Sequence, residues 1–215
     1  MRVRRKSWTP EVIQKALEIG LYVEHPETRK GHWKDAGKLT EVVLEIGAGK
    51  GDYWINLHPN DLDKLVIGME KVPDVAAIAL KKSMSLGIEK NHCFLIEDAQ
   101  DLSLFFDAGE LSRIHLNFSD PWPKAAHHKR RLTYPSKLEM YREVLENEGL
   151  IIFKTDNEQY FRDSLEYFDT NQWTLVQQDE DFRSRAQSDP MTEYEQRFVG
   201  QQLPIYRAIW RKKDV

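Results

Sequence analysis

The sequence predicts an α/β protein built on a mostly parallel sheet with helices on both faces. Short apolar runs recur along the chain, helix-like segments lie between them, and Gly, Asp or Pro ends most of the runs. Strands that are apolar on both faces must be covered on both faces, which is typical of a parallel sheet between layers of helices.

Seven segments are predicted as strands, the last two with the weaker pattern: 42–46, 65–69, 93–96, 114–118, 150–153, 173–176 and 206–210. Three segments are predicted as helices: 73–86, 136–147 and 157–168. The first of these helices opens with a proline, and a glycine follows each of the first two closely. We expect one domain, residues 1–215, in which residues 1–40 form an N-terminal extension that is basic at its start.

Composition excludes several classes of protein. The chain has 215 residues and a formal net charge of −4, an ordinary balance for a globular protein. Its one cysteine, Cys93, excludes an internal disulfide and a multi-cysteine metal site, and its apolar neighbours predict a buried thiol. No apolar run approaches the ~18 residues of a membrane span, and no apolar stretch follows the basic start. We therefore expect a cytoplasmic protein that does not contact membranes.

Charge is unevenly distributed along the chain. Residues 121–137 contain five bases, two histidines and no acid, whereas residues 139–169 contain nine acids and three bases. A run of charge is usually a solvated surface, but this one directly follows a predicted strand end. Lys and Arg side chains placed in this way favour contacts with the phosphates of a nucleic acid.

A glycine-rich turn follows the first predicted strand. The segment Gly47-Ala48-Gly49-Lys50-Gly51 fits neither the dinucleotide fingerprint nor the Walker loop, yet it occupies the position at which open α/β sheets bind ligands. Glu45 lies two residues before it, in the middle of an apolar strand, and a buried carboxylate there needs a partner. An ammonium group on a ligand would be one such partner.

Two further acids follow the next two strands. Glu70 ends the second strand, about 20 residues beyond the turn, where a carboxylate can hold ribose hydroxyls. Asp98 follows the third strand and is placed to accept from an adenine amino group. Each acid alone is as typical of a helix cap. The strand, the glycine turn and the three acids together resemble the class I methyltransferases that bind S-adenosylmethionine, which implies their Rossmann-like fold with a seven-stranded sheet.

A rigid turn ends the fourth strand, in the sequence Asn117-Phe118-Ser119-Asp120-Pro121-Trp122-Pro123. Two prolines stiffen the backbone around Trp122 and so fix Asp120 beside the predicted cofactor site. A purely structural turn packed by an aromatic ring is the alternative. Lys124 and the segment from Ala126 through His127, His128, Lys129 and Arg130 to Arg131 follow directly. Adjacent histidines beside three cations are poor metal ligands, so we expect no metal site.

Here the chain resembles the bacterial tRNA (guanine-N7)-methyltransferases. The motifs that carry this resemblance span nearly the whole sequence: 117–123 with His127 and 129–132, 154–157, 191–195 with Arg197 and Phe198, 204–207, and the opening Met1-Arg2-x-Arg4. The chain departs from the family at Ala125 and Ala126, where further bases are common.

The resemblance implies methyl transfer from S-adenosylmethionine to N7 of a guanosine in tRNA, guanosine 46 of the variable loop. It implies that Glu45, Gly47, Gly49, Glu70, Asp98 and Asp120 bind the cofactor. It also implies that the substrate is contacted by Lys124, Asp156, Thr192, Glu193, Tyr194 and Glu195, and that residues 126–131 face the RNA. Thr192 is as well suited to capping a helix. A monomer and a homodimer both stay open.

Asp120 is the candidate catalytic residue. Guanine N7 carries no proton, so no strong base is needed, but the product purine becomes cationic and a carboxylate can oppose that charge or orient the ring. Asp156 and Glu195 are further candidates on the side of the base. Two other classes stay open: a nicotinamide dehydrogenase on a similar sheet, and an RNA-binding protein without catalysis.

Overall fold

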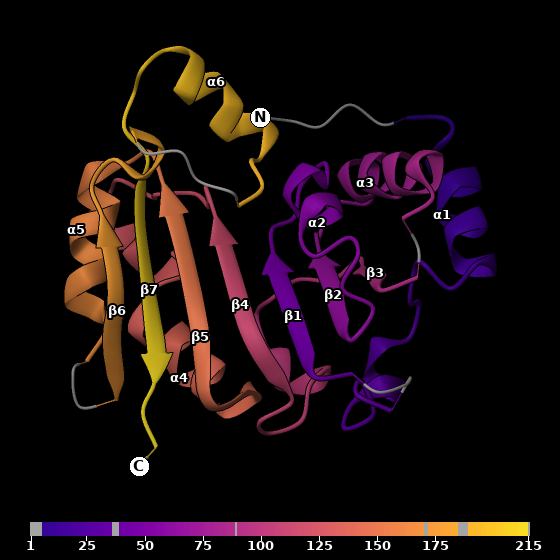
Figure 1. Ribbon diagram of the computed structural model, residues 1–215, viewed down its shortest axis with the longest axis horizontal. Coiled ribbons are helices and arrows are strands. Elements are labelled where there is room, and N and C mark those ends of the chain that lie inside the picture. The colour runs from indigo at the N-terminus through magenta and orange to yellow at the C-terminus, as the bar shows by residue number, and fades with distance from the viewer. Residues whose placement is uncertain (1–5, 36–38, 89, 170–171, 185–188, 215) are drawn as a thin grey trace.

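The computed structural model describes residues 6–35, 39–88, 90–169, 172–184 and 189–214. Its centre is a seven-stranded sheet in the order β3-β2-β1-β4-β5-β7-β6 (Figure 1). The strands are β1 Glu41–Ile46, β2 Lys64–Met69, β3 His92–Leu95, β4 Leu111–Asn117, β5 Leu145–Thr155, β6 Trp173–Asp179 and β7 Tyr206–Lys212. Only β7 runs antiparallel to its neighbours, so the mostly parallel sheet is confirmed.

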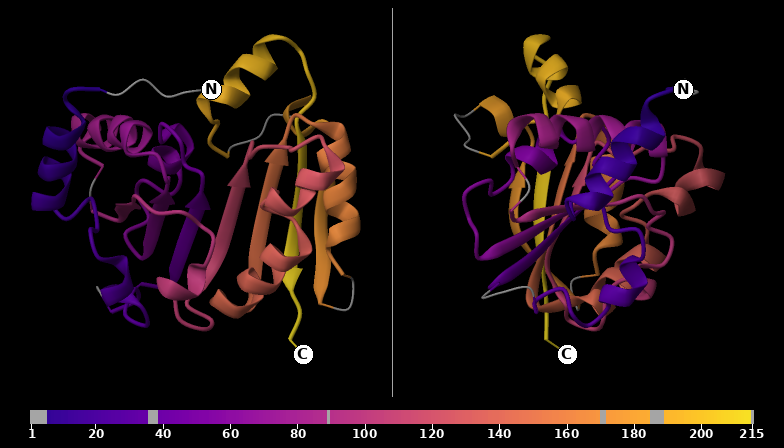
Figure 2. Two further views of the ribbon diagram at one scale, coloured as in Figure 1. Left: turned by 180° about the vertical axis from the view of Figure 1, so that it is seen from behind. Right: turned by 90° about the vertical axis from the view of Figure 1, so that its right-hand side faces the viewer.

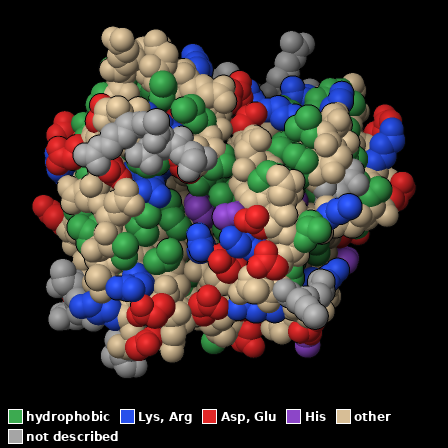
Figure 3. All heavy atoms as spheres, viewed as in Figure 1, with side chains coloured by type: hydrophobic (Ala, Val, Ile, Leu, Met, Phe, Trp, Pro, Cys, Tyr) green, Lys and Arg blue, Asp and Glu red, His purple; other side chains and the backbone are tan. Residues whose placement is uncertain are grey.

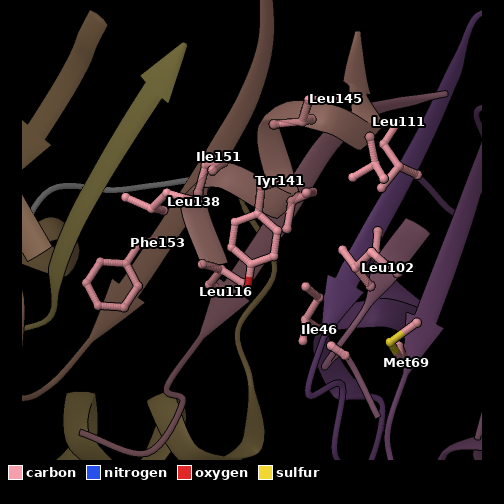
Figure 4. Packing of buried hydrophobic residues seen from close by; sticks show 14 of the residues in the cluster. Ile46, Met69, Leu102, Leu111, Leu116, Leu138, Tyr141, Leu145, Ile151 and Phe153 are labelled. Atoms are coloured by element: carbon pink, nitrogen blue, oxygen red, sulfur yellow. The ribbon is translucent and has the colours of Figure 1, made fainter. Parts of the chain in front are cut away.

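Helices cover both faces of the sheet, as predicted. On one face α1 (Thr9–Glu18), α2 (Asp52–Asn56) and α3 (Pro73–Leu86) pack on alternate residues of the first three strands, such as Val43, Val66 and Phe94. On the other face α4 (Pro135–Val144) and α5 (Glu158–Tyr167) pack on the opposite residues of the sheet (Figure 2, left). Figure 4 shows Leu138 and Tyr141 of α4 among strand residues of this second core.

The predicted helix 136–147 is too long at its end. α4 ends at Val144 and β5 begins at Leu145, because Leu145 pairs with Leu111 of β4 before a β-bulge. The helix predicted over 157–168 is confirmed, with Asn157 as its N-cap: the side chain of Asn157 accepts a hydrogen bond from the backbone N–H of Tyr160. Cys93 is buried, and burial raises the pKa of its thiol to about 12.

The parallel strands all end at one edge of the sheet, and α6 (Glu193–Gly200) lies beyond that edge (Figures 1 and 2). No described helix is both long and apolar enough to cross a bilayer. The basic start of the predicted N-terminal extension, residues 1–5, lies outside the described residues. Figure 3 shows one face of the molecule, over which acidic and basic side chains are interspersed.

Candidate active site

The glycine turn leaves open space at two of its three glycines. Gly47, Gly49 and Gly51 all have positive φ angles, +74°, +57° and +82°, which side chains disfavour. A Cβ on Gly47 would meet nothing within 4 Å, and one on Gly49 only the carbonyl oxygen of Gly47 at 3.8 Å. A Cβ on Gly51 would instead lie 2.6 Å from the Cβ of Ala79 on α3. Gly47 and Gly49 therefore leave room for a ligand, whereas Gly51 allows a helix to pack closely.

Glu45 is a buried carboxylate with one unsatisfied oxygen. Its side chain is 1% exposed; Asn117 Nδ2 donates to its Oε1 over 2.9 Å, while Oε2 has no hydrogen-bond partner. Burial raises the pKa of Glu45 to about 7, and the hydrogen bond from Asn117 and the charge of Lys154 act in the opposite direction. An unsatisfied buried oxygen beside open space is suited to a cationic hydrogen-bond donor on a ligand.

Glu70 and Asp98 lie at the same edge of the sheet but are not part of the pocket at the glycine turn. Glu70 directly follows β2, and its Oε1 accepts a hydrogen bond from the backbone N–H of Val72 over 2.9 Å. Asp98 is exposed, and its carboxylate lies 3.6 Å from Lys71 Nζ. Both acids keep the strand-end positions expected of them.

The turn after β4 carries unusual backbone angles. Phe118 and Trp122 have φ angles of +51° and +41°, which non-glycine residues seldom adopt. Such outliers are concentrated at functional sites, where the surrounding structure maintains them. Asp120 lies between these two residues in the sequence, and its side chain is exposed. Among the described residues it has no hydrogen bond or ion pair, which leaves its carboxylate accessible to a ligand.

The basic segment, which we define as residues 124–131, is anchored on that turn. Residues Ala125–Arg130 form a 3₁₀ helix, so Ala126, His127 and His128 lie on one short helical turn. The guanidinium of Arg130 lies 4.9 Å from the centre of the Trp122 ring, and the ring of His127 meets the ring of Trp122 edge-on at 5.9 Å. Lys124, Lys129 and Arg130 are exposed, as contacts with phosphates require.

Arg131 differs from the other bases of the segment. Its contact with RNA stays a prediction, but its side chain is 2% exposed. Its Nη1 lies 2.6 Å from Asp163 on α5, and its Nε donates to the carbonyl oxygen of Pro121 over 2.7 Å. Its Nη2 meets His128 Nε2 at 2.9 Å. Arg131 therefore fixes the rigid turn to α5 from inside the protein.

Residues 192–195 contain a capping box that opens α6. Thr192 Oγ1 accepts from the backbone N–H of Glu195, and Glu195 Oε2 accepts from the backbone N–H of Thr192. The contact of Glu195 with the substrate stays a prediction; its side chain is fully buried and paired with Lys154 and Arg183 at 2.9 and 2.6 Å. Its role is to hold the start of the helix.

Glu193 and Tyr194 face the mouth of the pocket. Glu193 lies 2.7 Å from Lys50 Nζ of the glycine turn. The ring of Tyr194 is 44% exposed and packs against Phe118 and Phe198, with centroids 5.4 and 4.8 Å away. Partial burial and the nearby Asp156 carboxylate raise the pKa of Tyr194, so Asp156 lies on this side of the site.

One pocket joins the two halves of the predicted site. It has a volume of about 190 Å³. Its walls are the glycine turn with Glu45, Tyr53 and Asn117 on one side, and Phe118 with Thr192, Glu193 and Tyr194 on the other. Glu45, Gly47 and Gly49 thus meet Thr192–Tyr194 around one space, although some 140 residues separate them in the sequence.

Four polar residues of this region were not among the predicted site residues: Lys50, Asn117, Lys154 and Arg183. Lys154 is a charged residue inside the apolar run of β5, the same signal that identified Glu45, and it is wholly buried. Arg183 offers no such signal, since its burial depends on Glu195 and Asp189. Within the described part of the chain, no group of three or more His, Cys, Asp or Glu residues could hold a metal ion.

Comparison with known proteins agrees with this geometry. A family described as "Putative methyltransferase" matches residues 40–208. A "tRNA (guanine-N(7)-)-methyltransferase" of Geobacillus sp. (strain WCH70) is 40% identical over 210 residues, which cover 97% of this chain and 94% of that protein. The protein of that name in Bacillus velezensis is 38% identical, over 100% of this chain and 99% of its own. The chain belongs to the tRNA (guanine-N(7)-)-methyltransferase family.

Solved structures support the Rossmann-like fold of class I methyltransferases. A "16S rRNA Methyltranferase KamB" matches with a TM-score of 0.63 at 13% identity, over 82% of this chain and 90% of that one. The "antibiotic-resistance methyltransferase Kmr" matches with a TM-score of 0.57 at 15% identity, over 83% and 90%. At such identities the likeness extends to the fold alone.

Proposed function

We propose that this member of the tRNA (guanine-N(7)-)-methyltransferase family transfers a methyl group from S-adenosylmethionine to N7 of a guanosine in tRNA. The observation that carries the proposal is the pocket between the glycine turn and the first turn of α6. A methyl donor and an acceptor base must meet in line, and most of the acceleration can come from holding them in that geometry. Guanosine 46 of the variable loop remains the expected target.

The residues present fit the methyl donor. The unsatisfied Oε2 of Glu45 can accept from the donor's ammonium group, and the space over Gly47 and Gly49 admits a ligand close to the backbone. Glu70 and Asp98 follow neighbouring strands, and we propose that they accept from ribose hydroxyls and an adenine amino group. When bound, S-adenosylmethionine supplies the electrophilic methyl group.

On the side of the acceptor, the exposed ring of Tyr194 and the free carboxylate of Asp120 suit a purine. A flat aromatic surface can stack on a base that has left its helix. Asp120 can oppose the positive charge that grows on the purine as N7 is methylated, or orient the ring by accepting from its amino group. Lys124, Lys129 and Arg130 are exposed beside it for contact with tRNA phosphates.

The whole chain is proposed to act as one unit in the cytoplasm, with residues 1–40 as an N-terminal extension. In support of this, α1 packs on α3, and the backbone N–H of Trp33 donates to Glu110 Oε1 over 2.8 Å. A monomer and a homodimer are both compatible with a pocket lined by one chain.

The direct test is methylation of bulk tRNA with labelled S-adenosylmethionine, followed by digestion and nucleoside analysis. We expect label in 7-methylguanosine, and in a tRNA that carries adenosine in place of guanosine 46 we expect none. Label in another nucleoside would contradict the proposal. Binding of tRNA without label transfer would favour an RNA-binding protein, and calorimetry with NAD would reveal a dehydrogenase.

Substitution of Asp120 tests the role assigned to it. Asp120→Asn keeps the size of the side chain and removes its charge, so the methyl-transfer rate should fall by ~10²-fold or more, the scale seen when one preorganised stabilising group is lost. Binding of tRNA should change little, because phosphates dominate it. The measurement is a single-turnover rate with both substrates saturating.

Asp35→Asn is the control for Asp120→Asn, since Asp35 is another exposed aspartate and its carboxylate pairs with His32, away from the turn after β4. This control should keep the rate of the parent. An Asp120→Asn variant within about twofold of the parent would remove the electrostatic role.

A further inference from the structure

A largely buried network of four charged side chains connects α6 to the sheet. Its members are two cations and two carboxylates: Lys154, Arg183, Asp189 and Glu195. Lys154 Nζ lies 2.9 Å from Glu195 and 3.1 Å from Asp189, and Arg183 lies 2.6 and 2.8 Å from the same two carboxylates. The charges cancel within the network, which is the condition under which buried ions are tolerated.

Lys154 also lies close to a residue that lines the pocket. Its Nζ lies 4.5 Å from the centre of the Tyr53 ring, and Tyr53 lines the pocket beside Glu45. Its positive charge favours the ionised form of the Glu45 carboxylate. Lys154 thus interacts with two carboxylates: that of Glu45, on the side of the methyl donor, and that of Glu195, in the first turn of α6.

The other described contacts that fix the start of α6 are weaker. The ion pair between Glu193 and Lys50 is half exposed, and such pairs contribute little because water screens them. The contact of Tyr194 with Phe118 is a single ring packing at 5.4 Å. The helix itself extends beyond the edge of the sheet (Figures 1 and 2). Its position over the pocket therefore depends chiefly on the buried network.

We propose that Lys154 and Arg183 are positioning residues that hold Thr192–Tyr194 over the pocket. Lys154 also favours the ionised carboxylate of Glu45, so it links the position of α6 to the charge of Glu45. The proposal rests on the methyl transfer proposed above, because it concerns how the acceptor side is set against the donor side. Arg183 acts only on α6, whereas Lys154 acts on both α6 and Glu45. The two residues therefore differ in what their removal should change.

Arg183→Met separates positioning from donor binding. The variant should bind S-adenosylmethionine like the parent in calorimetry without tRNA, because Arg183 does not line the pocket. Its single-turnover rate should fall by about 10²-fold, the cost of a misplacement of about 1 Å. Amide exchange over residues 193–200 should become faster. Arg183→Lys should restore part of the rate, since it keeps the charge.

Lys154 is tested together with its partner, because removing it alone would leave the buried Glu195 carboxylate with one of its two cations. The double variant Lys154→Met with Glu195→Gln removes one charge of each sign. It should lose methyl-transfer rate like Arg183→Met and should also bind the donor several-fold more weakly. The control is Arg113→Met, which breaks an ion pair with Glu41 near the other end of the sheet and should change neither quantity.

The outcomes discriminate between the claims. An Arg183→Met protein that is folded and keeps the parent's rate and amide exchange within about twofold overturns the positioning role. A double variant that binds the donor like the parent overturns the coupling to Glu45. If the parent itself transfers no methyl group to tRNA, the proposed function fails, and amide exchange and calorimetry still decide the role of the network.

Discussion

The floor of the pocket and the basic segment use charge in opposite ways. The pocket floor, which we define as Glu45, Asn117, Lys154 and Glu195, consists of buried groups joined in two pairs, Asn117 with Glu45 and Lys154 with Glu195, each at 2.9 Å. The basic segment presents Lys124, Lys129 and Arg130 to solvent. Charges on the floor are desolvated and act at short range, whereas those on the segment are screened and act together. Substitutions on the floor should therefore change geometry and pKa values, and those on the segment should change salt dependence.

The largest expected effect lies at the glycine turn above the floor. Gly49→Val would put a branched side chain into the space reserved for a ligand, and binding of S-adenosylmethionine should be lost while the protein stays folded. Calorimetry measures the affinity. Gly20→Val is the matched control, because Gly20 also has a positive φ, +75°, and open space around it. Both variants carry the same kind of backbone strain, so unchanged donor affinity in Gly49→Val would remove the turn from the site.

Arg131 tests the boundary between the two regions, since it lies within the basic segment but is buried. Arg131→Met should lower the free energy of unfolding by about 3 kcal/mol, because it leaves Asp163 without its cation and the carbonyl oxygen of Pro121 without its donor. Urea denaturation measures this. Lys129→Met, at an exposed position, should lie within about 0.5 kcal/mol of the parent. Equal effects of the two substitutions would contradict the structural role of Arg131.

These two residues also illustrate what the sequence can and cannot predict. The run 129–131 reads as three equivalent bases, and only the fold brings Asp163 and Tyr167 of α5 around the third one. The strands and the helix Pro73–Leu86 were predictable because their patterns are local. The end of α4 was not, because Leu145 pairs with a strand more than 30 residues away.

The same distinction applies to the site. Glu45 was predictable as a buried acid because its neighbours in the strand are apolar, and the glycines next to it indicated the turn. The burial of Glu195 was not predictable, because nothing in residues 191–195 shows that Lys154 and Arg183 would enclose its side chain. The antiparallel strand β7, inserted between β5 and β6, brings distant parts of the chain together in an order that hydrophobic patterns do not encode.

Titration of Glu45 is the third test, on the pocket floor. Its folded pKa of about 7 lies above the usual 4.5, so between these pH values the folded chain holds a proton that the unfolded chain has lost. Stability from this group is therefore greatest below about pH 4.5 and decreases as pH rises to 7. Donor binding should follow the opposite course, increasing about tenfold between pH 6 and pH 8 as the carboxylate ionises.

Glu45→Gln cannot ionise, so both pH dependences should become flat in this variant. Denaturation and calorimetry at several pH values measure the two quantities. A parent whose donor affinity is independent of pH in this range would exclude the ionised carboxylate as the partner of the donor's ammonium group.

The smallest expected effect lies in the exposed part of the basic segment. Lys129→Ala combined with Arg130→Ala removes two cations that neither line the pocket nor contact the floor. Each phosphate contact contributes between about 0.7 and 0.9 to the slope of log affinity against log salt, so the slope should become shallower by between about 1.4 and 1.8. Affinity for tRNA at low salt should fall severalfold, while affinity for S-adenosylmethionine and the free energy of unfolding should stay those of the parent.

Lys30→Ala with Lys90→Ala removes the same charge from two exposed positions outside the segment and should leave the slope unchanged. Filter binding at several salt concentrations measures all three proteins. If both double variants change the slope equally, the segment acts only through net charge, and the difference between it and the rest of the surface disappears.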